Sequence, residues 1–262
     1  GSKHLNNLVQ LYMQDNNIGR AGETALLAMR SRNLVEKKRV DDKLNLNEQR
    51  LGNKDLVSLA QYEKLDGIVS LTLRNNHFDY HGVQELANSP YLKNLKSLNL
   101  MSNAVGDKGL VLLAESPNLS QLESLNLENT GVTALGILAL SQSPHLNKLK
   151  ELNLNSNDLG EKGFRILADS GNFKNLTKLR TSGVSVGDTE FQAIVQSDTL
   201  SQLEELEAMG NVITRESLDS LADSAILPQL KKLDLRRNKL KDVDLIFLAD
   251  SPKFHNLEAL RF

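Results

Sequence analysis

The hydrophobic pattern of the chain repeats with a fixed period of 27 residues. Residues 91–117, 118–144 and 145–171 align without a gap, and each contains a Leu-x-Leu core at the same place. A period of this size indicates a solenoid of stacked units. The first Leu of the core recurs every 27 residues after one longer step of 33, at Leu11, Leu44, Leu71, Leu98, Leu125, Leu152, Leu179, Leu206, Leu233 and Leu260.

Each unit contains two structural periods, and its consensus is LxxLxxLxLxxNxφGxxGφxxLAxSPx, where φ is apolar. The Leu-x-Leu core alternates, which predicts a short strand with its leucines on one face. After two glycines the apolar residues follow helical spacing, as Leu110, Leu113 and Ala114 do. A Ser-Pro pair then ends the helix, because proline lacks a backbone N–H. We therefore expect ten strands centred on the leucine cores, and helices that begin near the second glycine of each unit.

A polar slot, usually Asn, follows each strand. A buried amide there can bond the backbone of the turn that leaves the strand. Because the slot repeats with the period, we assign it to the scaffold and not to catalysis or sugar binding. Asn fills the slot at Asn16, Asn76, Asn103, Asn157, Asn211 and Asn238, and the exceptions are Gln49, Thr130 and Val184.

Over nearly its whole length this pattern resembles the leucine-rich repeat, in the helix-containing class typified by ribonuclease inhibitor. The resemblance implies an α/β solenoid shaped as a curved horseshoe, with a parallel sheet on the concave face and helices on the convex face. The cysteine-free units with "LAxSPxLxxL" are also similar to leucine-rich-repeat effectors of intracellular bacteria. We expect one leucine-rich-repeat domain over residues 3–262, with about ten units, an insertion near 29–42 and a tag remnant at 1–2. Both ends fall inside a unit, so we expect them to be trimmed or covered by a partner.

The composition excludes several classes of function. A net charge of −2 and a pI near 6.3 give no overall attraction to nucleic acid or to an anionic membrane. No apolar run is long enough to span a bilayer. The chain has no cysteine, which removes disulfides, zinc–thiolate sites and cysteine nucleophiles. A reducing compartment fits this composition. We expect a cytoplasmic location, in the host cytoplasm if the protein is a secreted bacterial effector.

No motif points to catalysis, a metal or a cofactor. The sequence has neither a nucleophile elbow nor a phosphate-binding loop. His77 and His81 are four residues apart with Asp79 between them, but no third ligand is close. We therefore expect no catalytic residue, no metal site and no cofactor, and the chain is predicted not to be an enzyme. The insertion also carries a basic cluster, which could indicate RNA binding or nuclear localisation. We interpret it instead as part of a solvated helix on the flank or convex side. Its residues are Arg30, Arg32, Lys37, Lys38 and Arg39.

The residues that alternate with the leucines should line the concave face. In the last third of the chain they carry both signs of charge around Met209, which suits a protein partner better than a polyanion. In the same region Thr181 and Ala208 replace the second Leu, which indicates weakened core positions. A second patch lies at the turn of the third unit, where aromatic and basic side chains gather. The predicted partner-binding residues are Tyr12, Arg74, His77, Tyr80, Met101, Arg180, Glu207, Met209, Asp234, Arg236 and Arg237.

These observations predict a protein–protein interaction module that is a monomer on its own and binds its partner on the concave face. The resemblance to ribonuclease inhibitor and to bacterial effectors implies a sharper function, steric inhibition of a partner enzyme, which could be another bacterial effector or a host protein. The alternatives are a regulator of a small GTPase, because a Ran-type GTPase-activating family shares this repeat class, and a non-inhibitory scaffold. The sequence does not identify the partner.

Overall fold

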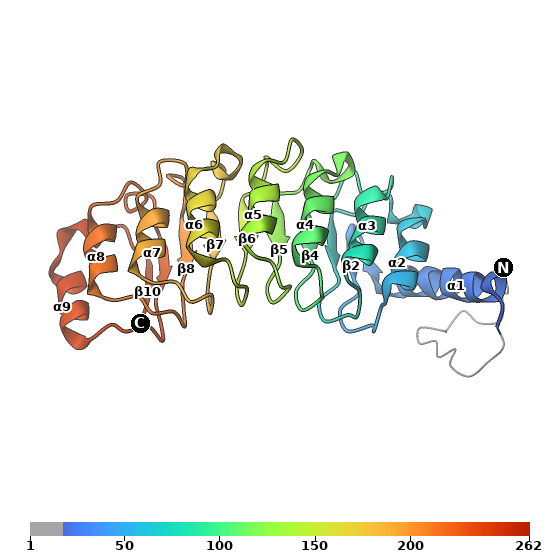
Figure 1. Cartoon of the computed structure of the whole chain (residues 1–262), viewed down its shortest axis with the longest axis horizontal. Helices are drawn as coiled ribbons and strands as arrows, with labels where there is room; N and C mark the ends of the chain where they lie inside the picture. Colours follow the sequence, from blue (N-terminus) through green and yellow to red (C-terminus); the bar gives the residue numbers. More distant parts are fainter. Residues whose placement is uncertain (1–17) are drawn as a thin grey trace.

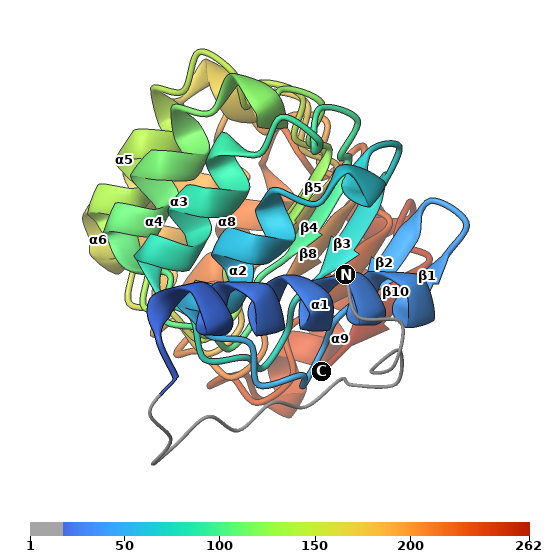
Figure 2. The ribbon, with the colours of Figure 1, turned by 90° about the vertical axis from the view of Figure 1, so that its right-hand side faces the viewer.

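Each unit folds as one strand followed by one helix, and the units stack in chain order. The computed structural model describes residues 18–262, and within them the strands form a single ten-stranded sheet in the order β1 to β10. Helices α2 to α8 stand side by side in one row in front of the strands, and α1 lies crosswise to them at the N-terminal end (Figure 1). Along the long axis, the strands lie on one side and most helices on the other (Figure 2). This is an open leucine-rich-repeat solenoid, with the parallel sheet on the concave face and the helices on the convex face.

The bounds of the elements follow the 27-residue period. The helices are α1 Arg20–Lys38, α2 Asn53–Ala60, α3 Tyr80–Asn88, α4 Gly106–Ala114, α5 Ala134–Ser141, α6 Gly160–Asp169, α7 Asp188–Val195, α8 Arg215–Ala222 and α9 Asp242–Asp250. The strands are β1 Arg39–Val40, β2 Lys43–Asn45, β3 Ser70–Thr72, β4 Ser97–Asn99, β5 Ser124–Asn126, β6 Glu151–Asn153, β7 Lys178–Arg180, β8 Glu205–Glu207, β9 Lys232–Asp234 and β10 Ala259–Arg261. Short 3₁₀ turns span Glu63–Leu65, Pro117–Leu119, Gly171–Phe173 and Pro252–Phe254.

The parallel strands β2 to β10 share one register. Leu71 lies opposite Leu98, and Leu98 lies opposite Leu125, so each residue pairs with the one 27 positions later. The repeating leucines therefore stack in a column, and those from Leu44 to Leu233 are at most 1% exposed. One strand and one helix cannot enclose a core alone, but the stack buries a continuous one.

The described part of the sheet begins with a strand that was not predicted. The strand expected at Leu11 lies outside the described residues and stays a prediction. Before the predicted strand at Leu44, β1 forms an antiparallel hairpin with β2, in which Arg39 lies opposite Leu44. The side chain of Arg39 holds this hairpin by donating to the carbonyl oxygens of Asp41, at 2.8 Å, and Asp66, at 3.3 Å. A basic residue of the insertion thus has a local structural role.

Residues 29–38 of the predicted insertion form the second half of helix α1, but this helix is not simply solvated as predicted. It lies across the N-terminal end of the described repeats (Figure 2). Its residues Leu34 and Val35 are 1% exposed, because they pack against the first described repeat, on the side that a preceding unit covers elsewhere in the stack. Arg30 is also buried, pairs with Asp55 and donates to the carbonyl oxygen of Gln49 at 2.6 Å.

The helices begin two or three residues before the second glycine of the unit. Gly136 is therefore inside the first turn of α5, where the preceding helix approaches closely. A Cβ atom at Gly136 would lie 2.7 Å from an oxygen of Asp107 and 2.9 Å from a methyl group of Leu110. At Gly136 the absence of a side chain is therefore required by helix packing.

Carboxylates of one unit also cap the helix of the next unit, a feature that was not predicted. The side chain of Asp107 in α4 accepts hydrogen bonds from the backbone N–H groups of Thr133 and Gly136, at 2.8 and 2.9 Å. Asp188 does the same for Thr214 at 2.9 Å, and hydrogen bonds from Thr214 and Ser217 lower the pKa of Asp188 against the opposing effect of burial. These bonds satisfy N–H groups that a helix start leaves without a partner.

Candidate protein-binding surface

The predicted Asn slot belongs to the scaffold. The side-chain N–H groups of Asn157 donate to the carbonyl oxygens of Leu127 and Leu154, at 2.8 and 3.0 Å. Its side-chain oxygen accepts from the backbone N–H groups of Thr130 and Val132, at 3.1 and 3.0 Å. One amide therefore links two successive turns from inside the solenoid, and the Asn column is not available to a ligand.

The outward columns lie on the other side of the strands. In β3, β4 and β5 the central Leu is buried while both flanking residues are half-buried. Thr72, Asn99 and Asn126 consequently form a polar column, as predicted for the concave face. Because the register does not slip, side chains from neighbouring units lie side by side on this face.

The charged residues of the last units are paired with one another. The carboxylate of Glu205 lies 2.6 Å from the ammonium groups of both Lys178 and Lys232. These two hydrogen bonds lower the pKa of Glu205 from 4.5 to about 2. Arg180 pairs in the same way with Glu207, at 2.9 Å. The predicted mixture of charges is therefore an ordered ladder across neighbouring strands.

Asp234, predicted as a partner-binding residue, is 5% exposed. Arg236 covers it, with its Nη2 atom 2.6 Å from the carboxylate, and Arg261 lies 3.7 Å away. Burial raises the pKa of Asp234, but the hydrogen bonds from Arg236 outweigh burial and hold it below its usual value. In this arrangement Asp234 orients the two arginines, and the arginines face outward.

The other predicted residues of the concave face occupy two environments. Met101 and Met209 are half-buried, and the backbone N–H of Met209 donates to the hydroxyl of Ser182 at 3.1 Å. Arg74 is exposed and pairs with Glu48 at 2.6 Å. The slots of Thr181 and Ala208 remain in the core, where these residues are 2% and 0% exposed. Tyr12 lies outside the described residues.

The turn of the third unit forms a separate cluster at the start of α3. The rings of Tyr80 and His81 stack with 4.0 Å between centroids, and the ammonium of Lys108 lies 4.9 Å from the Tyr80 ring. His81 Nδ1 is 3.0 Å from Asp79, whose pKa is lowered chiefly by the backbone N–H of His81. Tyr80 is half-buried and His81 is exposed.

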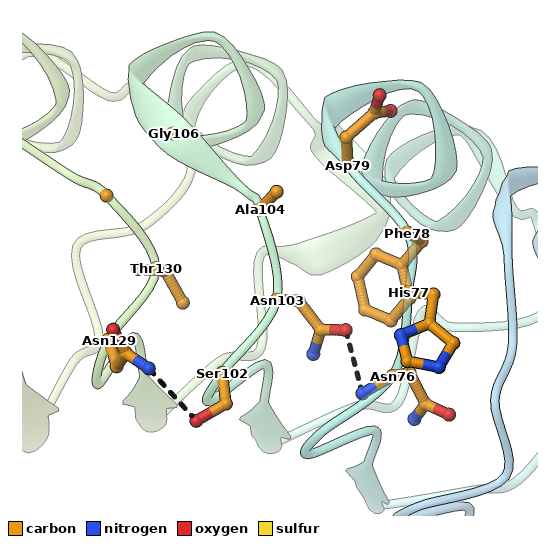
Figure 3. A pocket seen from close by; sticks show the side chains of 11 residues that line it. Asn76, His77, Phe78, Asp79, Ser102, Asn103, Ala104, Gly106, Asn129 and Thr130 are labelled. Carbon is orange, nitrogen blue, oxygen red and sulfur yellow. Dashed lines mark hydrogen bonds between the residues drawn. The ribbon is translucent and has the colours of Figure 1, made fainter.

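Beside this cluster is a shallow hollow of about 800 Å³, which His77, Asp79 and Asn129 help to line (Figure 3). Two of its lining residues are joined by a hydrogen bond of 3.1 Å from the backbone N–H of Asn76 to the side-chain oxygen of Asn103. In residues 18–262 no group of three or more His, Asp or Glu side chains is placed to hold a metal ion.

An exposed apolar group on the convex face was missed by the sequence reasoning. Leu135 of α5 is 67% exposed, and with Leu138 and Val111 it lines a groove between α4 and α5. The sequence could have indicated this group, because α5 has no charged residue that could face the solvent. No helix within the described residues is long and apolar enough to cross a membrane.

Comparisons with known proteins agree with this architecture. The leucine-rich-repeat family model matches residues 91–114, 145–165 and 228–249. The crystal structure of internalin C2 from Listeria monocytogenes superposes with a TM-score of 0.57 at 22% sequence identity, over 88% of this chain and 84% of that one. No curated protein sequence matches the chain significantly. The repeat, the register and the sheet-and-helix layers, together with the matched family model, show that the chain folds as a solenoid of leucine-rich repeats.

Proposed function

We propose that the protein binds a partner enzyme across its concave face and inhibits it sterically by covering the approach to the active site. The partner is another bacterial effector or a host protein, and the encounter takes place in the cytoplasm. The resemblance of the repeats to ribonuclease inhibitor and to effectors of intracellular bacteria supports this choice. The chain acts as a monomer, without catalysis, cofactor, nucleic acid or membrane.

The observation that carries the proposal is the unbroken 27-residue register of β2 to β10. It aligns outward side chains from many units into one surface, and these side chains can vary without disturbing the leucine core. A stable complex buries on the order of 1,600 Å² in total, which a surface of several units can supply. The Asn column holds the turns in place before binding, so little ordering of the sheet is required when the partner arrives.

The charge pairs support a binding role over catalysis. Catalytic groups need a nucleophile, a base and an orienting group placed around one point. On the concave face the ionisable side chains of Glu205, Glu207 and Asp234 are instead engaged by neighbouring lysines and arginines. Such a ladder suits recognition, because it presents charge in fixed positions.

Site-specific cross-linking tests the location. A photoreactive amino acid is placed at Thr72, Asn126 or Glu207 on the concave face, and at Glu115 or Lys162 on the convex helices. We expect the three concave positions to cross-link one protein from the natural cell extract, identified by mass spectrometry, and the convex positions to leave it unlabelled. Cross-links from the convex positions alone would place the site on the wrong face.

Titration tests the inhibition. The cross-linked enzyme is purified and its activity is measured against increasing amounts of the full chain. We expect activity to fall to near zero at one equivalent. Unchanged activity at saturation overturns inhibition in favour of a scaffold. Faster GTP hydrolysis by a captured GTPase overturns it in favour of a GTPase regulator.

A further inference from the structure

The concave face of strands β7 to β10 carries more basic than acidic side chains. We call the following nine outward residues the cationic strip: Lys178, Arg180, Lys232, Arg236, Arg237 and Arg261 with Glu205, Glu207 and Asp234. The strip has a surplus of three positive charges, although the whole chain has a net charge of −2. In the corresponding slots of β2 to β6 the balance is one negative charge, from Lys43, Arg74, Glu48, Glu128 and Glu151. The positive charge is therefore local to one end of the concave face.

The three carboxylates of the strip are already engaged within it. Glu205 accepts from two lysines, Asp234 is held by two arginines, and Glu207 pairs with Arg180. A basic group arriving from a partner would meet surplus positive charge and no unpaired carboxylate. An acidic group would meet exposed bases, since the side chains of Lys232, Arg236 and Arg261 are 53%, 46% and 63% exposed.

Arg237 is the base of the cationic strip that has no partner within residues 18–262. Its side chain makes no hydrogen bond or ion pair with any residue in 18–262. Its φ of +57° lies in the left-handed region, and the same slot holds Gly183 and Gly210 in the two preceding units. A bulky residue in this region costs about 1 kcal/mol relative to glycine. The same left-handed φ recurs in this slot from Glu48 onward, so this backbone geometry belongs to the repeat. What distinguishes Arg237 is an exposed guanidinium that is available to a partner.

The two glycines leave the edge of the strip open. A Cβ atom at Gly210 would have no neighbour closer than 4.0 Å, and one at Gly183 none closer than 3.7 Å. Two successive units thus lack a side chain at this edge, next to Arg237 and beside the half-buried Met209. An extended chain can cross here close to the backbone, with Met209 as an apolar contact beneath it.

We propose that the cationic strip binds an acidic segment of the protein partner, which crosses the edge at Gly183 and Gly210 and pairs its carboxylates with Arg237, Arg236 and Arg261. The inference rests on the proposed function and names the chemistry of its partner. A nucleic acid fits less well, because Glu205, Glu207 and Asp234 interrupt the row of bases that regularly spaced phosphates require.

A peptide-binding assay tests the charge preference. The full chain is titrated into a fluorescein-labelled peptide of glutamates, a peptide of lysines of equal length and a single-stranded oligonucleotide of equal charge, and anisotropy is read at low and at physiological salt. We expect the glutamate peptide to bind, the lysine peptide not to bind, and the affinity to fall with salt because exposed charges are screened.

Matched variants locate the binding. Arg237→Ser introduces the residue that Ser102 and Ser156 already place in this slot with the same left-handed φ, so the fold is retained. It should weaken binding of the glutamate peptide about three- to tenfold, the effect of one lost charge contact. Lys162→Ser removes the same charge from an exposed site on α6 and should leave affinity unchanged. Glu205→Gln removes a carboxylate from the strip and should strengthen binding about threefold.

Three results would overturn the inference: no binding of the glutamate peptide at low salt, equal losses in Arg237→Ser and Lys162→Ser, or tighter binding of the oligonucleotide that Arg237→Ser abolishes. The last result would assign the strip to nucleic acid. The cross-linking experiment separates the proposed function from the inference about an acidic segment. A partner that cross-links to Thr72 and Asn126 while the glutamate peptide fails to bind leaves the proposed function standing and removes only the acidic segment.

Discussion

Replacing Asn157 by alanine tests whether the Asn column stabilises the solenoid. The substitution removes four short hydrogen bonds of 2.8 to 3.1 Å, to the carbonyl oxygens of Leu127 and Leu154 and from the backbone N–H groups of Thr130 and Val132, at a residue that is 7% exposed. It also removes weaker branches to the carbonyl oxygen of Asn155 and from the hydroxyl of Thr130. The backbone N–H groups of Thr130 and Val132 then have no partner in a buried turn. Each of the four short hydrogen bonds contributes about 1 kcal/mol net. The buried N–H groups left behind are shielded from water, so new bonds to solvent do not recover this free energy. We therefore expect the free energy of unfolding to fall by about 4 kcal/mol.

Urea unfolding followed by circular dichroism measures this change. The control is Asn175→Ala, which removes an exposed amide that donates a single hydrogen bond to the carbonyl oxygen of Asn147 at 3.0 Å. It should cost less than about 1 kcal/mol. If the two variants lose similar stability, the amide at Asn157 is not the link between successive turns, and the reasoning about the Asn column is wrong.

Three further perturbations probe other contacts. The folded pKa of Glu205, about 2, lies below the usual 4.5, so its ionised form should stabilise the fold above pH 4.5, and this stability should be lost as the pH falls through about 2. The contribution is at most about 3 kcal/mol. Urea unfolding of the unmodified chain and of Glu205→Gln at both ends of this pH range should show a stability difference that disappears in acid. Arg237→Gly should raise the free energy of unfolding by about 0.5–1 kcal/mol by relieving the left-handed backbone, and a decrease in thermal midpoint would contradict this. Gly136→Ala should lower stability by about 1–2 kcal/mol because its Cβ would lie 2.7 Å from Asp107, whereas Gly171→Ala, with open space around it, should not, and equal thermal midpoints would refute the packing argument.

The candidate surface could be predicted in outline but not in detail. The alternation around the repeating leucines correctly placed Thr72, Asn99 and Asn126 on one outward column. The register of 27 residues could also have indicated that Lys178, Glu205 and Lys232 are neighbours. It could not indicate that Asp234 is buried beneath Arg236, since that depends on how two side chains two residues apart fold over one strand end.

The sequence by itself determined the repeat, the strand and helix of each unit, and their parallel stacking. These features depend on the spacing of apolar residues within one unit, and identical spacing in the next unit leaves one way to bury the leucines. Only the tertiary structure decided how α1 covers the first described repeat, how Asp107 and Asp188 cap the following helices, and which charges pair. The helix caps and the pair of Arg30 with Asp55 join residues 25 or more positions apart, and they arise only once the solenoid has brought the units together. A hydrophobic period specifies a stack, whereas polar partners are chosen by distances that exist only in the folded stack.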